Sequence, residues 1–398
     1  MRPVNTRRAV VVAAIGSTQT IAWASSYYMP AVLGAPIATG LHLSPNLFFG
    51  MFSAALLLSA AIGPSVGRLI DRYGGRPMLA AANLVIAAGL MMLAAAHGIT
   101  GLAGAWAVLG IGIGMGLYDP AFAALTWLYG REARNAITGI TLIAGFASTV
   151  GWPMSALFLH EFGWRAACLI WAGLNILLAA PVNWLAIPRA GTPTTQPRAA
   201  IESPIAASPR GTMPILIFFF AATWFVQGAM AAHLPGLLRA AGASSAAAIA
   251  AAALVGPAQV GARLIEFGLL RSFHPVSSAR IAAVLHPIGA AFLIALGAPG
   301  IILFALSHGA GNGMITIAKG TLPLALFGPQ GYGRRNGLLS APARVLQAAA
   351  PFLFGLLLTR VGVEAVWLSA GLCLAAFGSL FALCPGGVPA TGSLPARG

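Results

Sequence analysis

Three basic side chains, Arg263, Lys319 and Arg344, lie inside long apolar stretches of this sequence. A charge in such a segment costs several kcal/mol unless it faces a polar cavity or a partner, so each is a candidate for function. At about 1.5 Å per helical residue, all three lie roughly 12–13 Å from the polar gaps on one side. Arginine can hold a carboxylate through two parallel hydrogen bonds. Three cations at one depth therefore predict a binding site for an anion.

Two of these cations also have a structural interpretation. Arg263 and Glu266 are three residues apart, so on a helix they would share a face and could form an ion pair. Arg344 could instead extend its long side chain toward the aqueous boundary. Both alternatives remain open from the sequence.

Lys319 is the only lysine in the chain, and it shares helical spacing with His308, Asn312 and Thr316. We interpret this stripe as the wall of a cavity, with His308 in coupling or gating and the others in ligand binding. Polar residues also join helices in membranes by hydrogen bonds, which is the alternative for the stripe.

An acidic residue, Asp119, lies deep in another apolar stretch and is followed by Pro120. Proline removes a backbone donor and predicts a kink. Asp119 could carry a proton or act as a counter-ion to Lys319, or it could cap the kink.

Two further stretches carry side chains suited to a small ligand. Trp23 and Tyr27 lie in the first, and Gln227 and His233 in the seventh. They would supply aromatic, hydroxyl and amide contacts. Aromatic residues near the ends of spans also anchor helices at the membrane interface, so this assignment has an equally good structural alternative.

The composition shows whether the protein that carries these residues is surrounded by water or by lipid. Of 398 residues, 59% are hydrophobic and only 7% are charged, with a mean hydropathy of +0.87. A soluble domain carries about 25% charged residues. The sequence therefore excludes a soluble enzyme, a secreted disulfide scaffold and a disordered protein. Spanning segments in lipid are predicted to be helices.

About 12 apolar runs reach the length needed to span a bilayer. They predict an all-α membrane protein of 12 transmembrane helices in two six-helix halves, residues 1–187 and 213–398, joined by a polar linker at 188–212. The approximate runs are 9–36, 45–68, 76–97, 100–129, 136–159, 164–187, 213–238, 245–270, 279–297, 300–328, 337–359 and 364–384.

The net charge of +15 comes from arginines in the gaps between these runs. Sixteen of the 22 basic residues fall on one side, against Arg165, Arg239 and Arg360 on the other. This asymmetry predicts that both termini and the linker are cytoplasmic, in a bacterial inner membrane. The placement of the arginines explains the positive net charge, so we expect no nucleic-acid partner. The three cysteines form no CxxC pair, so we expect neither a metal site nor a disulfide.

The two halves carry matching motifs. Gly110, Gly112 and Gly114 recur 199 positions later as Gly309, Gly311 and Gly313. We interpret both glycine runs as sites of close helix packing. A duplication of six plus six helices is typical of carriers that work by alternating access, with the ligand site between the halves.

The segment from Gly67 to Pro77, GRLIDRYGGRP, resembles the loop between helices two and three of the major facilitator superfamily, G-x-L-x-D-R-x-G-R-K. It occupies the position expected for that loop, after the second span. The resemblance implies the superfamily's fold and a gating role for Asp71, Arg72 and Arg76. The glycines would allow a tight turn and close helix contact, and Asp71 could cap or pair with the nearby arginines.

A narrower resemblance covers two helices. The stretch from Ser244 to Gly268, and the start of the third run at Arg76, are similar to monocarboxylate porters and oxalate–formate exchangers. The resemblance implies that Arg263 binds the substrate carboxylate, helped by Arg344. Two positions depart from the proton-coupled members: Gln259 stands where they have an aspartate, and Ala31 follows the first-helix proline where they have a lysine.

From these observations we expect a secondary active transporter of a small organic anion, a monocarboxylate or short dicarboxylate. Its mechanism is predicted to be alternating access, by proton coupling or by anion exchange. Asp119, Glu266 and His308 are the candidates for coupling. We expect a functional monomer surrounded by lipid, with no cofactor.

Two alternatives belong to other functional classes. A multidrug or toxic-compound exporter of the same fold would depend on Asp119 rather than on Arg263. A membrane-embedded enzyme would need a catalytic motif, and the sequence has no HExxH, GxSxG or phosphate loop.

Overall fold

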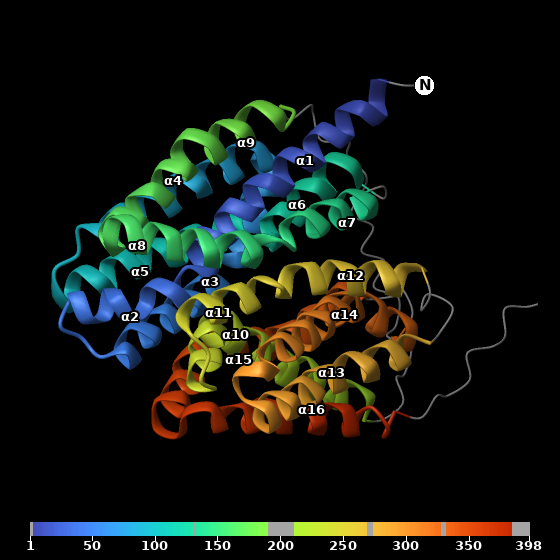
Figure 1. The fold of residues 1–398 in the computed structure, drawn as a ribbon. Helices are drawn as coiled ribbons and strands as arrows, with labels where there is room; N and C mark the ends of the chain where they lie inside the picture. The colour runs from blue at the N-terminus through green and yellow to red at the C-terminus, as the bar shows by residue number, and fades with distance from the viewer. Residues whose placement is uncertain (1–2, 131–132, 190–210, 269–273, 328–331, 384–398) are drawn as a thin grey trace, which may run out of the picture.

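The computed structural model describes residues 3–130, 133–189, 211–268, 274–327 and 332–383, and every regular element in them is a helix (Figure 1). Within these residues, ten helical stretches are long and apolar enough to cross a membrane. Two of them, Asn135–Ala186 with 52 residues and Leu338–Ser379 with 42, are each long enough for two passes. The expected all-α fold of 12 transmembrane passes is therefore confirmed.

The first six passes are built from elements between residues 3 and 187, several of which are broken within the span. The first four are α1 (Pro3–Trp23), a π-helical turn (Ala24–Tyr28) and α2 (Pro30–Gly40); α3 (Pro45–Tyr73); α4 (Gly75–Ala94); and α5 (Gly98–Gly116) with α6 (Tyr118–Tyr129). The fifth is α7 (Ala133–Ala144) with the first part of α8 (Ala147–Leu174), which is broken at Gly163. The sixth is the rest of α8 with a second π-helical turn (Asn175–Ala179) and α9 (Ala180–Ala186).

The last six passes are built from elements between residues 212 and 379. They are α10 (Thr212–Ala240); α11 (Ser245–Ala253) and α12 (Val255–Gly268); α13 (Pro275–Leu296); α14 (Ile301–Phe327); α15 (Tyr332–Val361); and α16 (Val366–Ser379). Short 3-10 turns at Ala298–Gly300 and Gly362–Ala365 precede α14 and α16.

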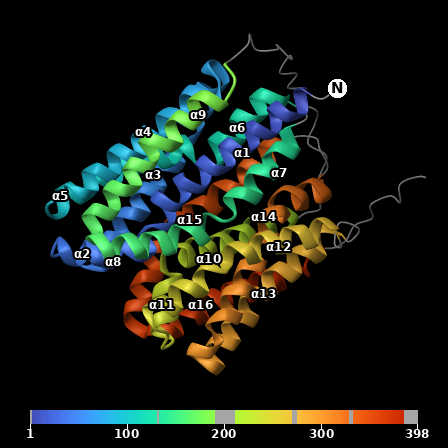
Figure 2. The ribbon, with the colours of Figure 1, turned by 45° about the horizontal axis from the view of Figure 1, so that its top comes forward.

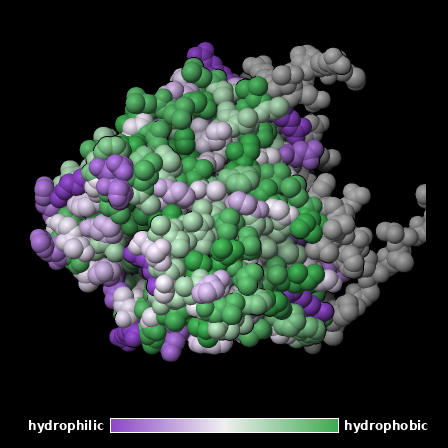
Figure 3. Space-filling view, viewed as in Figure 1, coloured by the Kyte–Doolittle hydropathy of each residue, from purple (hydrophilic) through white to green (hydrophobic). Residues whose placement is uncertain are grey.

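The helices form two groups, the blue-to-green first six passes and the yellow-to-red last six (Figures 1 and 2). The groups meet mainly through α3 with α15, through α8 with α11 and α12, and through α2 with α10. We name the end that holds Ile187 and Thr212 the linker end, and the opposite end, with Gly40 and Ala240, the far end. On the face seen in Figure 3, apolar residues cover the middle and hydrophilic residues gather toward the two ends.

The fourth pass is broken at Leu117, whose ψ is −158°, three residues before the kink expected at Pro120. Because Pro120 has no N–H, the carbonyl of Gly116, four residues earlier, loses its helical partner. The Gln19 side-chain amide donates to that carbonyl at 2.6 Å. In lipid a freed backbone group must find such a partner, so the break is stabilised by the first pass.

The glycine runs pack as the sequence predicts. A Cβ on Gly110 would lie 2.7 Å from the carbonyl oxygen of Ala55 in α3, and one on Gly309 would lie 2.7 Å from that of Val255 in α12. Equivalent glycines in the two halves thus press against equivalent helices. No side chain fits at either contact.

A buried chain of amides, which the sequence did not reveal, joins helices inside the first half. Thr18 donates to Asn183 at 2.8 Å, Asn183 to Asn83 at 2.8 Å, and Asn83 to Asn175 at 2.9 Å. Asn175 in turn donates to Ser25 at 3.0 Å, which ties the two π-helical turns together. Such fully paired polar networks fix one packing arrangement.

Gly256 of α12 lies in close contact with the first group of helices, so a single added methyl group should have a measurable effect there. A Cβ on Gly256 would lie 2.1 Å from Thr149 Oγ1 and 2.9 Å from the Gly145 carbonyl. Gly256→Ala should therefore lower stability by about 1–3 kcal/mol through overpacking. The matched control is Gly261→Ala on the same helix, where nothing lies within 4 Å and alanine should be tolerated. Melting temperatures in detergent compare the two, and equal values would contradict this packing.

Candidate functional site

Arg263 is the most deeply buried of the three predicted cations, with only 7% of its surface exposed. Its guanidinium donates to the Thr141 carbonyl across the interface at 2.7 Å, and to Gln259 Oε1 and Thr316 Oγ1 at 3.4 Å each. Its Nε has no hydrogen-bond partner. In the described part of the chain, its partners are neutral oxygens, and Glu266 makes no ion pair with it.

Asp119 and Arg344 form an ion pair across the two halves, with 2.7 Å between Oδ2 and Nη2. The break at Leu117 places Asp119 in the first turn of α6, where a carboxylate is favoured by the helix dipole. The Arg344 guanidinium also lies beside Gly63 of α3. Thus Arg344 points into the interface and is an ion-pair partner of Asp119.

Lys319 completes the cation cluster from the second half. Its Nζ lies 4.3 Å from the centre of the Trp224 ring, a cation–π contact. It also lies within electrostatic range of Asp119 and Arg344. One partly exposed carboxylate therefore serves Lys319 and Arg344 together, which leaves an excess of positive charge.

An aromatic wall from the first half faces these cations. The rings of Trp23 and Tyr118 are 4.8 Å apart, and those of Trp23 and Tyr27 are 4.9 Å apart. Tyr118 forms a side-chain hydrogen bond with Arg263. Trp23 Nε1 is buried without a hydrogen-bond partner. The wall therefore combines apolar surface with an unused donor.

Gln347, one turn beyond Arg344, bridges the first and seventh passes. Its amide donates to the Tyr27 hydroxyl at 3.3 Å and to Gln227 Oε1 at 3.4 Å. Tyr27 and Gln227 are thus brought together through Gln347, a residue that the sequence did not single out.

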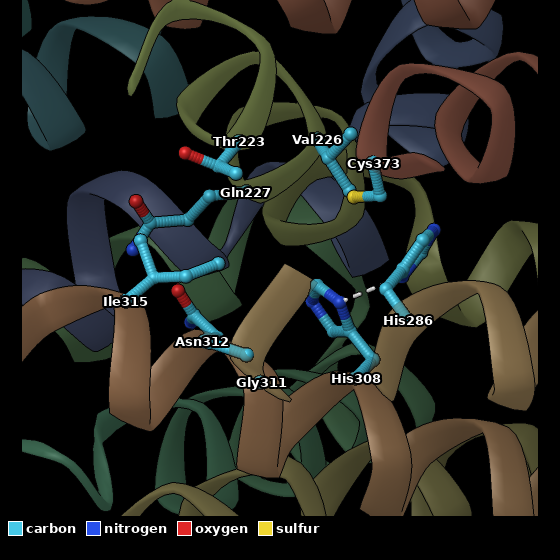
Figure 4. A pocket seen from close by; sticks show the side chains of 10 residues that line it. Thr223, Val226, Gln227, His286, His308, Gly311, Asn312, Ile315 and Cys373 are labelled. Carbon is cyan, nitrogen blue, oxygen red and sulfur yellow. Dashed lines mark hydrogen bonds between the residues drawn. The ribbon is translucent and has the colours of Figure 1, made fainter. Parts of the chain in front are cut away.

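The polar stripe of α14 faces the interior along its length. Thr316 donates to the Asn312 carbonyl at 2.9 Å and accepts from Arg263. Asn312 and His308 line a small cavity of about 10 Å³, together with Thr223 and Gln227 of α10 (Figure 4). His308 contacts a second imidazole there, His286 of α13, with 3.0 Å between their Nδ1 atoms. The sequence assigned no role to His286.

Two predicted residues lie away from this cluster. His233 bonds the Pro351 carbonyl at 2.7 Å, and its ring is 4.1 Å from that of Phe49, so it belongs to the far-end contact between halves. Glu266 is buried toward the linker end of α12 and interacts with Ser278 of α13, away from Arg263.

The loop between the second and third passes also lies apart from the cations. Gly74 has a φ of 80°, and a Cβ on Gly75 would lie 2.1 Å from that of Ala124, as expected for a tight turn with close packing. Arg72 lies over the Tyr73 ring, and Arg76 lies 4.5 Å from the centre of the Trp184 ring. Within the described residues, Asp71 is exposed and forms no ion pair with either arginine.

Comparison with known families identifies one match over most of the chain. The profile of the Major Facilitator Superfamily matches residues 15–307. The fold is similar to a bacterial homologue of the human lysosomal transporter Spinster in an inward-facing, occupied conformation, with a TM-score of 0.67 and 16% identity over 94% of both chains.

Relatives with assigned functions match shorter stretches. Over 133 residues, 33% of this chain, it is 29% identical to the multidrug resistance protein fnx1 of Schizosaccharomyces pombe. Over 127 residues, 31% of this chain, it is 29% identical to monocarboxylate transporter 3 of Rattus norvegicus. Each match spans only 25% of the relative's length.

The exposure of the Asp119–Arg344 pair predicts how much it stabilises the fold. The two side chains are 55% and 33% exposed, so the pair should contribute only about 0.2–1 kcal/mol. A double-mutant cycle with Asp119→Asn and Arg344→Gln, read by denaturant unfolding in detergent, measures this coupling. A coupling above roughly 3 kcal/mol, typical of a buried pair, would contradict the geometry.

Proposed function

This chain belongs to the Major Facilitator Superfamily and is a multi-pass membrane transporter, and from that premise we propose that it carries a small organic anion. The substrate class is a monocarboxylate or short dicarboxylate. Its binding site lies between the halves, at Arg263, Lys319 and Arg344. Trp23, Tyr27, Gln227, Asn312 and Thr316 form the surrounding wall.

One observation carries this proposal: Arg263 is buried, yet its described partners are neutral. A buried guanidinium is strongly favoured by an anionic partner, which forms shorter and stronger hydrogen bonds than a neutral oxygen does. The carboxylate of a substrate would supply that partner. It could reach Arg263 from the side of the unused Nε.

The Asp119–Arg344 ion pair could link substrate binding to movement of the two halves. Asp119 competes with a substrate carboxylate for Arg344, and the pair joins α6 of one half to α15 of the other. Substrate that displaces Asp119 would therefore loosen a contact between the halves. Binding would thus be linked to the rearrangement on which alternating access depends.

Export of multidrug compounds is the competing proposal, supported by the similarity to fnx1. It requires a site that attracts large, apolar or cationic ligands. The aromatic wall would suit such ligands, but the excess of positive charge would repel cations. We therefore favour the anion. We further propose a bacterial inner-membrane location with cytoplasmic termini, in which the carrier works as a monomer and the loop of Asp71, Arg72 and Arg76 gates the linker end.

The role of Arg263 can be tested by ligand-induced thermal stabilisation. Lactate, pyruvate, oxalate and benzoate are compared with lipophilic cations on the purified protein in detergent. A ligand that binds only the folded state raises the melting temperature by mass action. At least one carboxylate should stabilise the protein. Arg263→Gln should weaken its binding about ten- to a hundredfold, the loss of about 1.5–3 kcal/mol of charge-assisted hydrogen bonding.

Arg280→Gln is the matched control, because the Arg280 guanidinium bonds the Leu380 carbonyl and lies over the Phe381 ring, outside the cluster. Its ligand response should equal that of the wild type. Stabilisation by lipophilic cations alone would replace the anion with the drug-export proposal.

Lys319 should act through its charge. Lys319→Arg keeps the charge over Trp224 and should bind the carboxylate nearly as well as the wild type, whereas Lys319→Met should bind it clearly more weakly. Carboxylate titrations of the three proteins make the comparison. Equal affinities for all three would give Lys319 a purely structural role.

A further inference from the structure

Two buried histidines, His286 of α13 and His308 of α14, line the small cavity of the second half. We propose that this pair is a site that binds one proton, and that the proton is taken up on His308 Nε2. The coupling of this proton to transport rests on the proposed anion site, whereas the proton site itself does not. It lies among helices of one half, apart from the Asp119–Arg344 pair.

The hydrogen bonds assign a proton to each imidazole. Ser369 donates its single hydroxyl hydrogen to the Val366 carbonyl at 2.8 Å. At 2.9 Å from His286 Nε2, its oxygen must therefore accept, so His286 carries its proton on Nε2. His286 Nδ1 is then a bare acceptor, and the 3.0 Å contact requires His308 to carry its proton on Nδ1. Only the Nε2 lone pair of His308 is left free.

That lone pair faces the cavity. In Figure 4 the His308 ring points one nitrogen at His286 and the other away from it, toward the side of the cavity where Ile315 and Asn312 lie. The cavity of about 10 Å³ has room for about one water molecule. A proton can therefore reach Nε2 from hydronium: an N–H bond forms as an O–H bond breaks, and a water molecule is left.

The geometry accepts one proton and resists a second. Protonated His308 still donates from Nδ1 to His286, so every existing hydrogen bond is kept and the positive charge is stabilised by His286. A second proton would place two N–H groups against each other at the 3.0 Å contact. The pair therefore binds a single proton as one coupled unit.

No described carboxylate lines this cavity. Its titratable residues are the two imidazoles and the Cys373 thiol of α16. Charged groups on the surrounding helices have other partners: Arg280 of α13 bonds the Leu380 carbonyl, and Lys319 of α14 lies over Trp224. On α12, which packs against α14, Arg263 contacts Thr316 and Glu266 interacts with Ser278. His233 of α10 bonds the Pro351 carbonyl. Among the residues that line the cavity, the imidazoles are thus the groups that can take up positive charge.

The stripe of α14 links this proton to the proposed anion site. His308 and Thr316, which contacts Arg263, are eight residues apart, so about 12 Å separates them along the helix. At that distance and an effective dielectric constant of about 20, one added charge raises affinity for a monovalent anion about tenfold. Anion binding raises proton affinity by the same factor. This coupling favours symport of proton and anion.

Nitrogen-15 NMR of the histidine-labelled protein in detergent tests the proton site without any substrate. The chain has seven histidines, and His286→Gln and His308→Gln assign the pair. His233, which must donate from Nε2 to the Pro351 carbonyl, is an internal reference. At pH values where both imidazoles are neutral, His286 should carry its proton on Nε2 and His308 on Nδ1. From about pH 8 to about pH 4, the range that brackets imidazole titration, the pair should take up one proton.

Opposite tautomers, uptake of two independent protons, or no uptake over that range would overturn the site. The coupling is tested with benzoate, whose affinity should rise about tenfold as the pair is protonated in the wild type and stay constant in His308→Gln. A constant affinity in the wild type would overturn the coupling. If no carboxylate binds at any pH, the anion proposal and the coupling fail together, while the NMR titration still decides the proton site.

Discussion

The structure depends most on one electrostatic constraint: a guanidinium is buried between two helix groups with neutral oxygens as its described partners. Arg263 takes acceptors from its own helix, from α14 and from α7 of the other half. A charge in this position is costly unless its surroundings remain polar. This requirement accounts for the polar stripe of α14, the hydroxyl of Tyr118 and the amide of Gln259 around it. It also leaves the site best suited to a ligand that brings negative charge.

The apolar solvent imposes a second constraint, because each interrupted helix must have its free backbone groups paired. Pro120 frees the Gly116 carbonyl, and Gln19 of the first pass pairs with it. Pro257 likewise frees the Ala253 carbonyl, four residues earlier, and Thr149 of the other half donates to it at 2.7 Å. The break in the fourth pass places Tyr118 and Asp119 at the interface between the halves. The hydrogen bond from Gln19 that stabilises this break therefore also helps to position side chains of the proposed site.

Much of the architecture could be predicted from the sequence, because lipid makes span length and arginine placement strongly informative. The glycines at 110 and 309 correctly indicated close packing of equivalent helices. The site was only partly predictable. The sequence offered Lys319 as one possible counter-ion of Asp119. The fold also gives Asp119 an ion pair with Arg344, which helical spacing could not indicate, because it says nothing about which distant helices meet. His286, Gln347 and Tyr118 were missed for the same reason: each acquires its role from a partner 22 or more residues away in the sequence.

Anomalous diffraction from crystals grown with a brominated benzoate would locate the anion most directly. If the carrier binds organic anions as proposed, the bromine peak should lie between the halves, with the carboxylate density against the guanidinium of Arg263 and near Lys319 and Arg344. The peak should vanish in Arg263→Gln crystals that keep the same fold. A fully occupied peak that persists in that variant, or that lies only against the aromatic wall with its carboxylate turned from the cations, would contradict an anion site built on Arg263.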